Sequence, residues 1–281
     1  MSFEMRPARH EDVAGIAPWT VDTFEWGDYV SERLPSWIDD PDSHPLVCVD
    51  DAGRPVAVAN TAMLSPTEAW LEGARVHPGF KRSGMGSAMN RAGTEWARRR
   101  GGRVARLATE ITNIASQRQV EAIGYRHTSS WAQATLVPGE RPAVVPGRGL
   151  SQANLTDVDA CWLSWSTSEL ARAGREMRAI GWRWRKARPE DLVGAASRGE
   201  LLQTPTGWAL VEHPEPDWLR IGWVISDPDG LPGLIEGLAD LGSSMAVDEI
   251  GLTVPWLPWV VETLTRAGGT PREILVYTMG L

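Results

Sequence analysis

Apolar runs separated by turn residues dominate the first part of the chain. Residues 46–50 and 55–64 are two such runs, and they flank the turn-forming segment 51–54 (Asp-Ala-Gly-Arg), so they predict a β-hairpin. A third run, 70–76, predicts the next strand. Because strands joined by short turns pair antiparallel, the pattern predicts an antiparallel meander over residues 46–76.

Short helices are predicted ahead of this meander. Residues 6–13 read as the end of a strand followed by a helix, which we expect Pro18 to close. Gly27 and Pro35 then interrupt 19–40, so this segment predicts two short helices and a loop rather than one long helix.

After residue 84 the apolar spacing changes to that of a helix. The predicted apolar stripe consists of Met85, Ala88 or Met89, Ala92 and Trp96. Glu95 and Arg99 form an i,i+4 pair outside the stripe, and Gly101-Gly102 ends the helix. Residues 103–109 then predict a strand parallel to 70–76, by the usual crossover rule.

A second helix and a last strand complete this region. Thr112 or Asn113 caps a helix over 114–123, Gly124 ends it, and 125–136 predicts extended chain. This order of elements predicts an α+β fold: a mixed, mostly antiparallel sheet flanked by helices.

Beyond residue 138 the pattern repeats. Residues 139–149 are rich in proline and glycine and predict a linker. The segment 218–226 (Trp-Leu-Arg-Ile-Gly-Trp-Val-Ile-Ser) then parallels 70–78, and 249–254 parallels 103–109. We therefore expect two tandem copies of one domain, over 1–138 and 150–281.

Composition excludes several classes of protein. The chain has 281 residues, a net charge of −8 and no uninterrupted apolar stretch of about 18 residues, which argues against a nucleic-acid partner and a membrane span. No signal peptide is apparent, and the two cysteines, Cys48 and Cys161, have no paired spacing, so we expect a cytoplasmic protein. The five histidines have no metal-ligand spacing, so we expect no metal site.

The segment 76–87 (Val-His-Pro-Gly-Phe-Lys-Arg-Ser-Gly-Met-Gly-Ser) carries the most specific chemistry. It joins a predicted strand to a predicted helix through two basic residues, Lys81 and Arg82, and two glycines, Gly84 and Gly86. Glycines let backbone N–H groups approach an anion closely, and a helix N-terminus adds its positive dipole end. The segment therefore predicts a pyrophosphate site.

The same segment resembles motif A of the GNAT acyltransferase superfamily, [Gln/Arg]-x-x-Gly-x-[Gly/Ala] after a strand that ends in Val-x-Pro. Asn113-x-x-Ser116 followed by Gly124-Tyr125 is similar to a second family pattern, so the resemblance covers about 135 residues. It implies acetyl-CoA as co-substrate. The cofactor contacts that it implies are Arg75, Val76, Lys81, Arg82, Ser83, Gly84, Met85, Gly86, Ser87, Asn113 and Ser116.

One position departs from the family pattern. The tyrosine that many members use as general acid falls on Val120, which cannot donate a proton. Either the CoA thiolate leaves unassisted, or another group such as Tyr125 serves.

Acyl transfer to an amine also needs a base, because an amine near neutral pH is mostly protonated. Glu72, on the strand before the anion loop, is the first candidate, and the resemblance implies contact between this residue and the acceptor amine; Glu110 is the second. With the acidic stretch 22–40, these carboxylates favour a small cationic acceptor. Its predicted contacts are Trp26, Asp28, Tyr29 and Glu72.

Three functions remain open on the sequence, of which the third, a structural or protein-modifying partner, has no specific sequence feature in its favour. The first is an acetyl-CoA-dependent N-acetyltransferase for a small amine such as an amino acid, metabolite or antibiotic, acting as a monomer or homodimer. The second is a catalytically silent acyl-CoA sensor. In the first two cases we expect CoA on the first copy only, because Asp227 and Asp229 replace the basic residues of the anion loop in the second.

Overall fold

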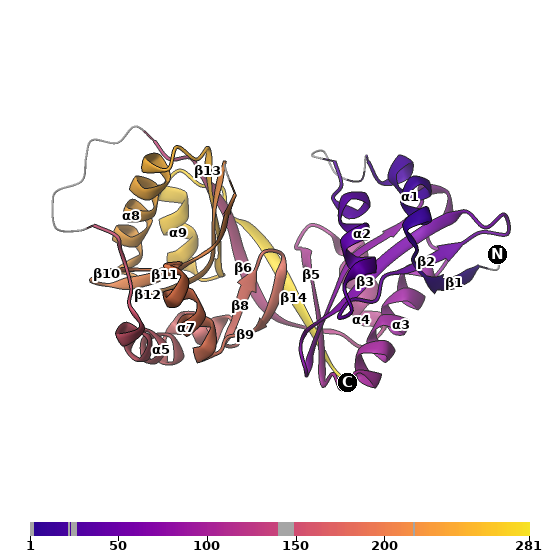
Figure 1. Ribbon diagram of the computed structural model, residues 1–281, viewed down its shortest axis with the longest axis horizontal. Helices are drawn as coiled ribbons and strands as arrows, with labels where there is room; N and C mark the ends of the chain where they lie inside the picture. Colours follow the sequence, from indigo (N-terminus) through magenta and orange to yellow (C-terminus); the bar gives the residue numbers. More distant parts are fainter. Residues whose placement is uncertain (1–2, 22, 24–26, 140–148, 216) are drawn as a thin grey trace. The chain divides into compact units, whose positions relative to one another are not determined.

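The computed structural model describes residues 3–21, 23, 27–139, 149–215 and 217–281, and these form two compact units (Figure 1). The N-terminal unit comprises 1–108, 113–127 and 277–281, and the C-terminal unit comprises 109–112 and 128–276. The division at residue 127 differs from the boundary at 138 that the repeat suggests. The reason is that strands β6 (Arg126–Leu136) and β14 (Arg272–Gly280) each contribute residues to both units.

The N-terminal unit contains the predicted alternation of strands and helices. Its other elements are β1 (Glu4–Pro7), η1 (His10–Asp12), α1 (Val13–Thr20), α2 (Val30–Asp39), β2 (Leu46–Val49), β3 (Pro55–Ser65), β4 (Glu68–Val76), η2 (Pro78–Phe80), α3 (Met85–Arg99), β5 (Val104–Glu110, of which the last two residues belong to the C-terminal unit) and α4 (Ile114–Ala122). The strands lie in the order β1-β2-β3-β4-β5, with every neighbouring pair antiparallel except β4 and β5, which are parallel. The hairpin, the meander and the crossover predicted from the sequence are confirmed.

Helices cover both faces of this sheet, because successive side chains of a strand point to opposite sides. Val47 and Val58 belong to one apolar cluster with Ile16 of α1 and Leu34 of α2. Cys48 and its neighbours on β3 belong to another cluster, which Met85 and Met89 of α3 complete. The unit is therefore a three-layer α+β structure.

Two details of the helix prediction were wrong. Pro18 and Pro35 lie inside α1 and α2 instead of ending a helix, so 19–40 holds the end of α1, a connection and one helix. In α3 the buried face is Met85, Met89, Asn90, Gly93, Thr94 and Ala97. Trp96, placed in the core stripe by the sequence, is only partly buried and stacks on His44, with ring centroids 5.0 Å apart.

β4 and β5 separate near their carboxyl ends. Their parallel pairing covers three residue pairs, from Glu68↔Val104 to Trp70↔Arg106, although β4 continues to Val76 and β5 to Glu110. Gly73, with φ of +66°, accompanies a shift of register between β3 and β4 in this stretch. The backbone of the second half of β4 is thus released from its neighbour on the β5 side.

The C-terminal unit repeats this plan. Besides β6 and β14 it contains β7 (Ser151–Gln152), η3 (Leu155–Asp157), α5 (Val158–Thr167), α6 (Glu169–Ala173), β8 (Met177–Ile180), β9 (Arg183–Lys186), α7 (Pro189–Arg198), β10 (Leu201–Thr204), β11 (Gly207–Glu215), β12 (Trp218–Ser226), α8 (Leu231–Ser244), β13 (Glu249–Pro255) and α9 (Pro258–Arg266). β12 and β13 are parallel with α8 between them in the chain, as β4 and β5 are with α3. The order β6-β13-β12-β11-β10-β7 forms its sheet.

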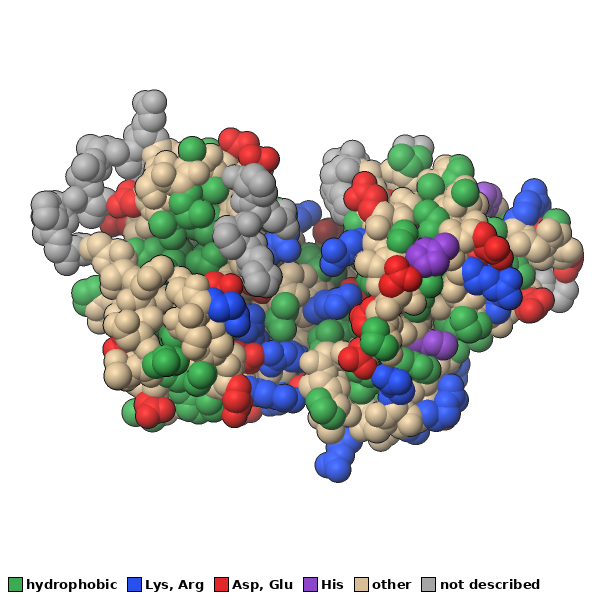
Figure 2. All heavy atoms as spheres, viewed as in Figure 1, with side chains coloured by type: hydrophobic (Ala, Val, Ile, Leu, Met, Phe, Trp, Pro, Cys, Tyr) green, Lys and Arg blue, Asp and Glu red, His purple; other side chains and the backbone are tan. Residues whose placement is uncertain are grey.

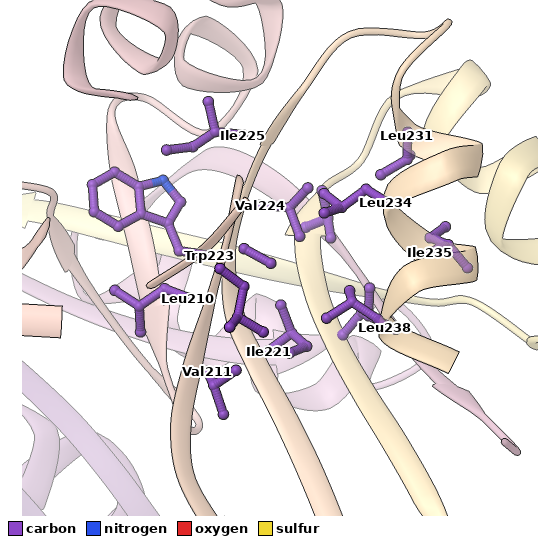
Figure 3. Packing of buried hydrophobic residues seen from close by; sticks show 14 of the residues in the cluster. Leu210, Val211, Ile221, Trp223, Val224, Ile225, Leu231, Leu234, Ile235 and Leu238 are labelled. Carbon is purple, nitrogen blue, oxygen red and sulfur yellow. The ribbon is translucent and has the colours of Figure 1, made fainter. Parts of the chain in front are cut away.

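The core of the C-terminal unit is formed by residues of this sheet and of α5, α7, α8 and α9. Figure 3 shows Val224 of β12 close to Leu234 of α8, whereas Trp223 points away from that helix. Trp223 makes edge-on contacts with Trp162 and Trp165 of α5, at centroid distances of 6.4 and 5.2 Å. The tryptophans of this unit therefore serve packing on both faces of the sheet.

Candidate functional site

The anion loop lies between β4 and α3, where the sequence places it. His77 Nδ1 accepts a hydrogen bond from the Gly79 N–H at 3.1 Å and so fixes the turn that Pro78 begins. Arg82 and Gly84 then adopt positive φ values, +64° and +85°. Such angles turn consecutive N–H groups to one side of the chain, as in other anion-binding loops.

α3 begins immediately after Gly84. Its first helical hydrogen bond joins the Ala88 N–H to the Gly84 carbonyl at 3.0 Å, so Met85, Gly86 and Ser87 have the unpaired N–H groups of the first turn. A Cβ built on Gly84 would meet no atom within 4 Å. The space in front of the helix N-terminus is thus open, and a phosphate there would meet donors and the positive end of the helix dipole.

Two buried polar atoms accompany this loop. Ser83 Oγ and Gln119 Nε2 are buried, and neither has a hydrogen-bond partner among the described residues. Gln119 belongs to α4 and lies against the loop, since a Cβ on Gly86 would be 2.8 Å from its Nε2. Unpaired buried donors are costly, so they fit a site whose ligand supplies acceptors.

Sequence reasoning missed Gln119. The signal that could have found it is its position three residues after Ser116, one helical turn further along α4. Asn113 and Ser116 themselves are joined locally, because Asn113 Oδ1 accepts the Ser116 N–H at 3.1 Å and caps α4. Their contact with a cofactor stays a prediction, as it does for the exposed Lys81 and Arg82.

The predicted acceptor residues of the N-terminal unit come together beside β4. Asp28 accepts a hydrogen bond from Arg75 Nε at 2.6 Å and a second from the Val30 N–H at 2.8 Å, which anchors the start of α2 to the strand. The Arg75 guanidinium lies over the Tyr29 ring, 5.5 Å from its centroid. Burial raises the pKa of Tyr29 against the opposing effect of Arg75, so the phenol is neutral near pH 7.

This geometry changes two sequence-based expectations. The Arg75 side chain forms an ion pair with Asp28. A contact between Arg75 and the cofactor would therefore be made by the backbone of Arg75. Asp28 in turn is an ion-paired, fully buried carboxylate and offers no free negative charge to a cationic acceptor. Trp26, also predicted to contact the acceptor, lies outside the described residues.

Glu72 lies on β4 in the same region and is partly exposed. Its Oε1 accepts a hydrogen bond from Asn60 Nδ2 of β3 at 3.0 Å. The role of Glu72 as general base stays a prediction.

The second candidate base has a different environment. Glu110 belongs to the C-terminal unit, where its Oε1 accepts a hydrogen bond from Arg272 at 3.3 Å, and its side chain is 40% exposed. Glu110 is thus paired with a cation, whereas Glu72 accepts a hydrogen bond from a neutral amide.

Tyr125 is removed from the candidate general acids. It is fully buried, its hydroxyl is hydrogen-bonded to Thr94 Oγ1 of α3 at 2.9 Å, and burial raises its pKa to about 12. Val120 is buried as well. A phenol enclosed in the core cannot reach a leaving thiolate, so the position serves packing.

In the C-terminal unit the loop before α8 has a different geometry. Asp227 Oδ1 accepts the Gly230 N–H at 2.7 Å, so the protein's own carboxylate takes a donor that an anion would need. A Cβ on Gly230 would lie 2.6 Å from the Thr206 carbonyl oxygen, in contrast to the open space at Gly84. A hollow of about 180 Å³ beside this loop is lined by Glu169 as well as Asp227.

The side chains visible on one face of the protein carry both charges. Figure 2 shows Lys and Arg interspersed with Asp and Glu over the N-terminal unit on that face.

Among the described residues no helix is long and apolar enough to cross a bilayer, and no group of three or more His, Cys, Asp or Glu is placed to hold a metal ion.

Comparisons with known proteins give a family match for the N-terminal part and a fold for the whole chain. Residues 13–125 match the profile of the acetyltransferase (GNAT) family. A GCN5-related N-acetyltransferase from Sphaerobacter thermophilus is similar over 99% of this chain and 95% of its own, at 17% identity and a TM-score of 0.68. A tandem GNAT protein from the clavulanic acid biosynthesis pathway is similar over 99% and 98%, at 15% identity and a TM-score of 0.62. No curated protein matches the chain.

At such identities the structural likeness shows the fold alone, and the match to the family profile is confined to residues 13–125. The predicted α+β fold with two tandem GNAT-like copies is confirmed. The chain therefore has the fold of tandem GNAT proteins, and the acetyltransferase (GNAT) family profile matches its N-terminal part, residues 13–125.

Proposed function

We propose that this protein is an acetyl-CoA-dependent N-acetyltransferase that acts on a small cationic amine, with both substrates bound by the N-terminal unit. The observation that carries the proposal is the open anion loop, in which the space at Gly84 faces the first turn of α3 and the unpaired Ser83 Oγ is buried nearby. GNAT proteins typically use acetyl-CoA, and the loop matches what a pyrophosphate needs.

Bound acetyl-CoA would supply the thioester whose acetyl group is transferred. The loop and the amides of Met85, Gly86 and Ser87 would hold its pyrophosphate. The released backbone of β4 beyond Trp70 offers hydrogen-bonding groups to the pantetheine.

Glu72 would take a proton from the acceptor ammonium and pass it to solvent. The neutral amine then attacks the thioester carbonyl, a C–N bond forms, the nitrogen loses its second proton to solvent, and the C–S bond breaks to release the CoA thiolate. Because a thiol has a pKa of about 8.5, this thiolate is a good leaving group and requires no protein acid. The chain is thus able to work with Val120 at the usual tyrosine position.

The acceptor is proposed to be a small amine near Glu72 and Tyr29. Glu72 carries the negative charge for a cation there, since Asp28 is neutralised by Arg75. The Tyr29 ring adds an aromatic surface.

Calorimetry with acetyl-CoA and CoA-thiol release with a panel of amino acids, polyamines and aminoglycosides test this function. We expect micromolar binding of acetyl-CoA and thiol release that depends on an amine. The alternative, a catalytically silent acyl-CoA sensor, is favoured by the absence of a tyrosine at position 120. Binding without amine-dependent thiol release across the panel would support the sensor instead.

A further inference from the structure

The side chain of Gln119, on α4, ends against the first turn of α3. A Cβ built on Gly86 would be 2.8 Å from Gln119 Nε2 and 3.3 Å from its Oε1. A side chain at position 86 would therefore displace the amide of Gln119. The glycine makes the room in which this amide lies.

The amide nitrogen of Gln119 lacks a partner inside the protein. It is buried and makes no hydrogen bond with any residue that the structure describes, and the same holds for Ser83 Oγ in the loop before α3. An amide nitrogen has two hydrogens to donate, and a donor left unpaired away from water lowers stability. Two such groups beside one loop indicate that the acceptor comes from outside the chain.

Packing alone gives a poor reason for a glutamine at position 119. A leucine has a similar size and would contact the first turn of α3 without burying a polar group. The property that leucine lacks is the pair of amide hydrogens. The position therefore has a use for a hydrogen-bond donor.

The surroundings of this donor favour an anion. Residues 76–89 contain no Asp or Glu, and the exposed Lys81 and Arg82 form no ion pair within the described part of the chain. The acid of α4, Glu121, accepts a hydrogen bond from Tyr277 Oη at 3.2 Å. An anion in front of α3 would thus meet positive charge and unpaired N–H groups with no carboxylate of the loop to repel it.

The Gln119 amide is able to reach such an anion. Gln119 as a whole is only partly buried, and the terminal torsion of a glutamine has a broad, shallow energy profile. The amide can therefore rotate toward the first turn of α3 while the rest of the side chain stays in place. A hydrogen bond from an amide to a charged oxygen is stronger than one to a neutral acceptor.

We propose that Gln119 is a binding residue for the cofactor pyrophosphate: its Nε2 donates a hydrogen bond to a phosphate oxygen beside Gly86. The inference rests on the proposed function, because it takes the anion to belong to acetyl-CoA. The contact is made with the pyrophosphate and not with the acetyl group. Loss of Gln119 should therefore weaken binding and leave kcat at saturating acetyl-CoA unchanged.

The test replaces Gln119 in two ways and measures acetyl-CoA affinity by calorimetry. Gln119→Leu removes the donor, and we expect the Kd to rise about tenfold or more, as for the loss of a hydrogen bond to a charged group. Without ligand, this variant should melt at the wild-type temperature or above it, because a buried unpaired donor has been removed. Gln119→Glu keeps the size but places a negative charge beside the phosphates, so its Kd should rise further.

Gln117→Leu is the matched control. It makes the same change at another partly buried position of α4, and two residues along a helix correspond to a rotation of roughly 200°, so the two side chains point in nearly opposite directions. We expect wild-type affinity for this variant. An equal loss in Gln117→Leu and Gln119→Leu would mean that the affinity reflects the general integrity of α4, and it would overturn the inference.

NMR of the side-chain amides shows the donor directly. The Gln119 NH₂ signals, assigned with Gln119→Leu, should move downfield when acetyl-CoA is added, and unmoved signals would contradict the proposed hydrogen bond. Calorimetry separates the two proposals. A wild-type protein that binds no acetyl-CoA would overturn the proposed function and this inference together, whereas wild-type binding with unchanged affinity in both Gln119 variants would overturn the inference alone.

Discussion

At the scale of single residues, the chemistry depends on whether a side chain is ionised, exposed and free to exchange a proton. Glu72 is the strongest candidate base, because it is partly exposed and accepts a hydrogen bond from the neutral amide of Asn60. Glu110 is paired with Arg272, and Tyr125 is enclosed. The types and order of these residues could be predicted from the sequence. Their partners could not, because each partner comes from a distant part of the chain.

Glu72→Gln removes the proton acceptor and keeps the size of the side chain. We expect kcat to fall by about 10²–10⁴-fold, the usual loss for a general base, with unchanged acetyl-CoA affinity and partial recovery at raised pH. Glu95→Gln, which alters an exposed ion-paired glutamate of α3, is the matched control and should have wild-type kinetics. Full activity of Glu72→Gln would mean that the amine arrives neutral and the site acts by positioning alone.

Tyr125→Phe removes a buried hydroxyl. Thr94 Oγ1 would still bond to the Asn90 carbonyl at 2.7 Å, so we expect a loss of only about 1–2 kcal/mol in the free energy of unfolding. Thermal or urea denaturation measures this change. Turnover and its pH dependence should not change. A hundredfold fall in kcat at unchanged stability would indicate that Tyr125 acts as a general acid.

His44 gives the N-terminal unit a pH-dependent stability. Burial lowers its pKa, and the Arg99 charge adds to the effect, so the folded protein favours the neutral ring. As pH falls below the ordinary histidine value of about 6.5, the unfolded chain gains the proton first and stability decreases, until pH passes the lower folded pKa. His44→Phe retains an aromatic partner for Trp96. The melting temperature of this variant should fall less between pH 7.5 and 5.5 than that of the wild type; equal decreases would refute the assignment.

At the scale of elements, the proposed cofactor site is formed by the strand, loop and helix from β4 to α3. It was predictable because its signals are local: alternation, a proline, two glycines and a helical stripe. The helix face was predicted less well. Gly93, which looks neutral in the sequence, faces the core because α3 approaches β3 so closely that a Cβ there would lie 2.0 Å from Thr61 Oγ1. Such close packing is a tertiary property.

Gly84 allows a test at this scale with two substitutions. Gly84→Ala puts a residue with a side chain at φ of +85°, which costs about 1–2 kcal/mol but enters open space. Gly84→Asp adds a negative charge in the proposed phosphate site as well. We expect the alanine variant to bind acetyl-CoA somewhat more weakly and the aspartate variant to lose binding, with similar melting temperatures for the two. Calorimetry measures the affinities, and micromolar affinity in Gly84→Asp would exclude the loop as the cofactor site.

At the scale of the whole molecule, one sequence pattern has produced two copies with different loops. The repeat itself was predictable from residues 218–226 and 249–254. The contribution of β6 and β14 to both units could not be predicted, because strand pairing joins residues far apart in the chain. The apolar pattern of a strand does not determine which strand pairs with it. For the same reason the sequence boundary at 138 lies eleven residues after the division at 127.

The two loops predict one acetyl-CoA per chain. The loop before α3 is open and flanked by Lys81 and Arg82, whereas the loop before α8 carries Asp227, which already holds the Gly230 N–H, and Asp229. A pyrophosphate at the second site would have to displace one carboxylate and approach another, and like charges at such distances repel strongly. Calorimetry should therefore give a stoichiometry of one, and Gly84→Asp should abolish binding without leaving a second, weaker phase. The double variant Asp227→Asn, Asp229→Asn should still bind one acetyl-CoA per chain. The second loop encloses too little space for a phosphate, because even a Cβ on Gly230 would meet the Thr206 backbone. Two bound molecules per chain in the wild type would show that the C-terminal copy has kept its own cofactor site.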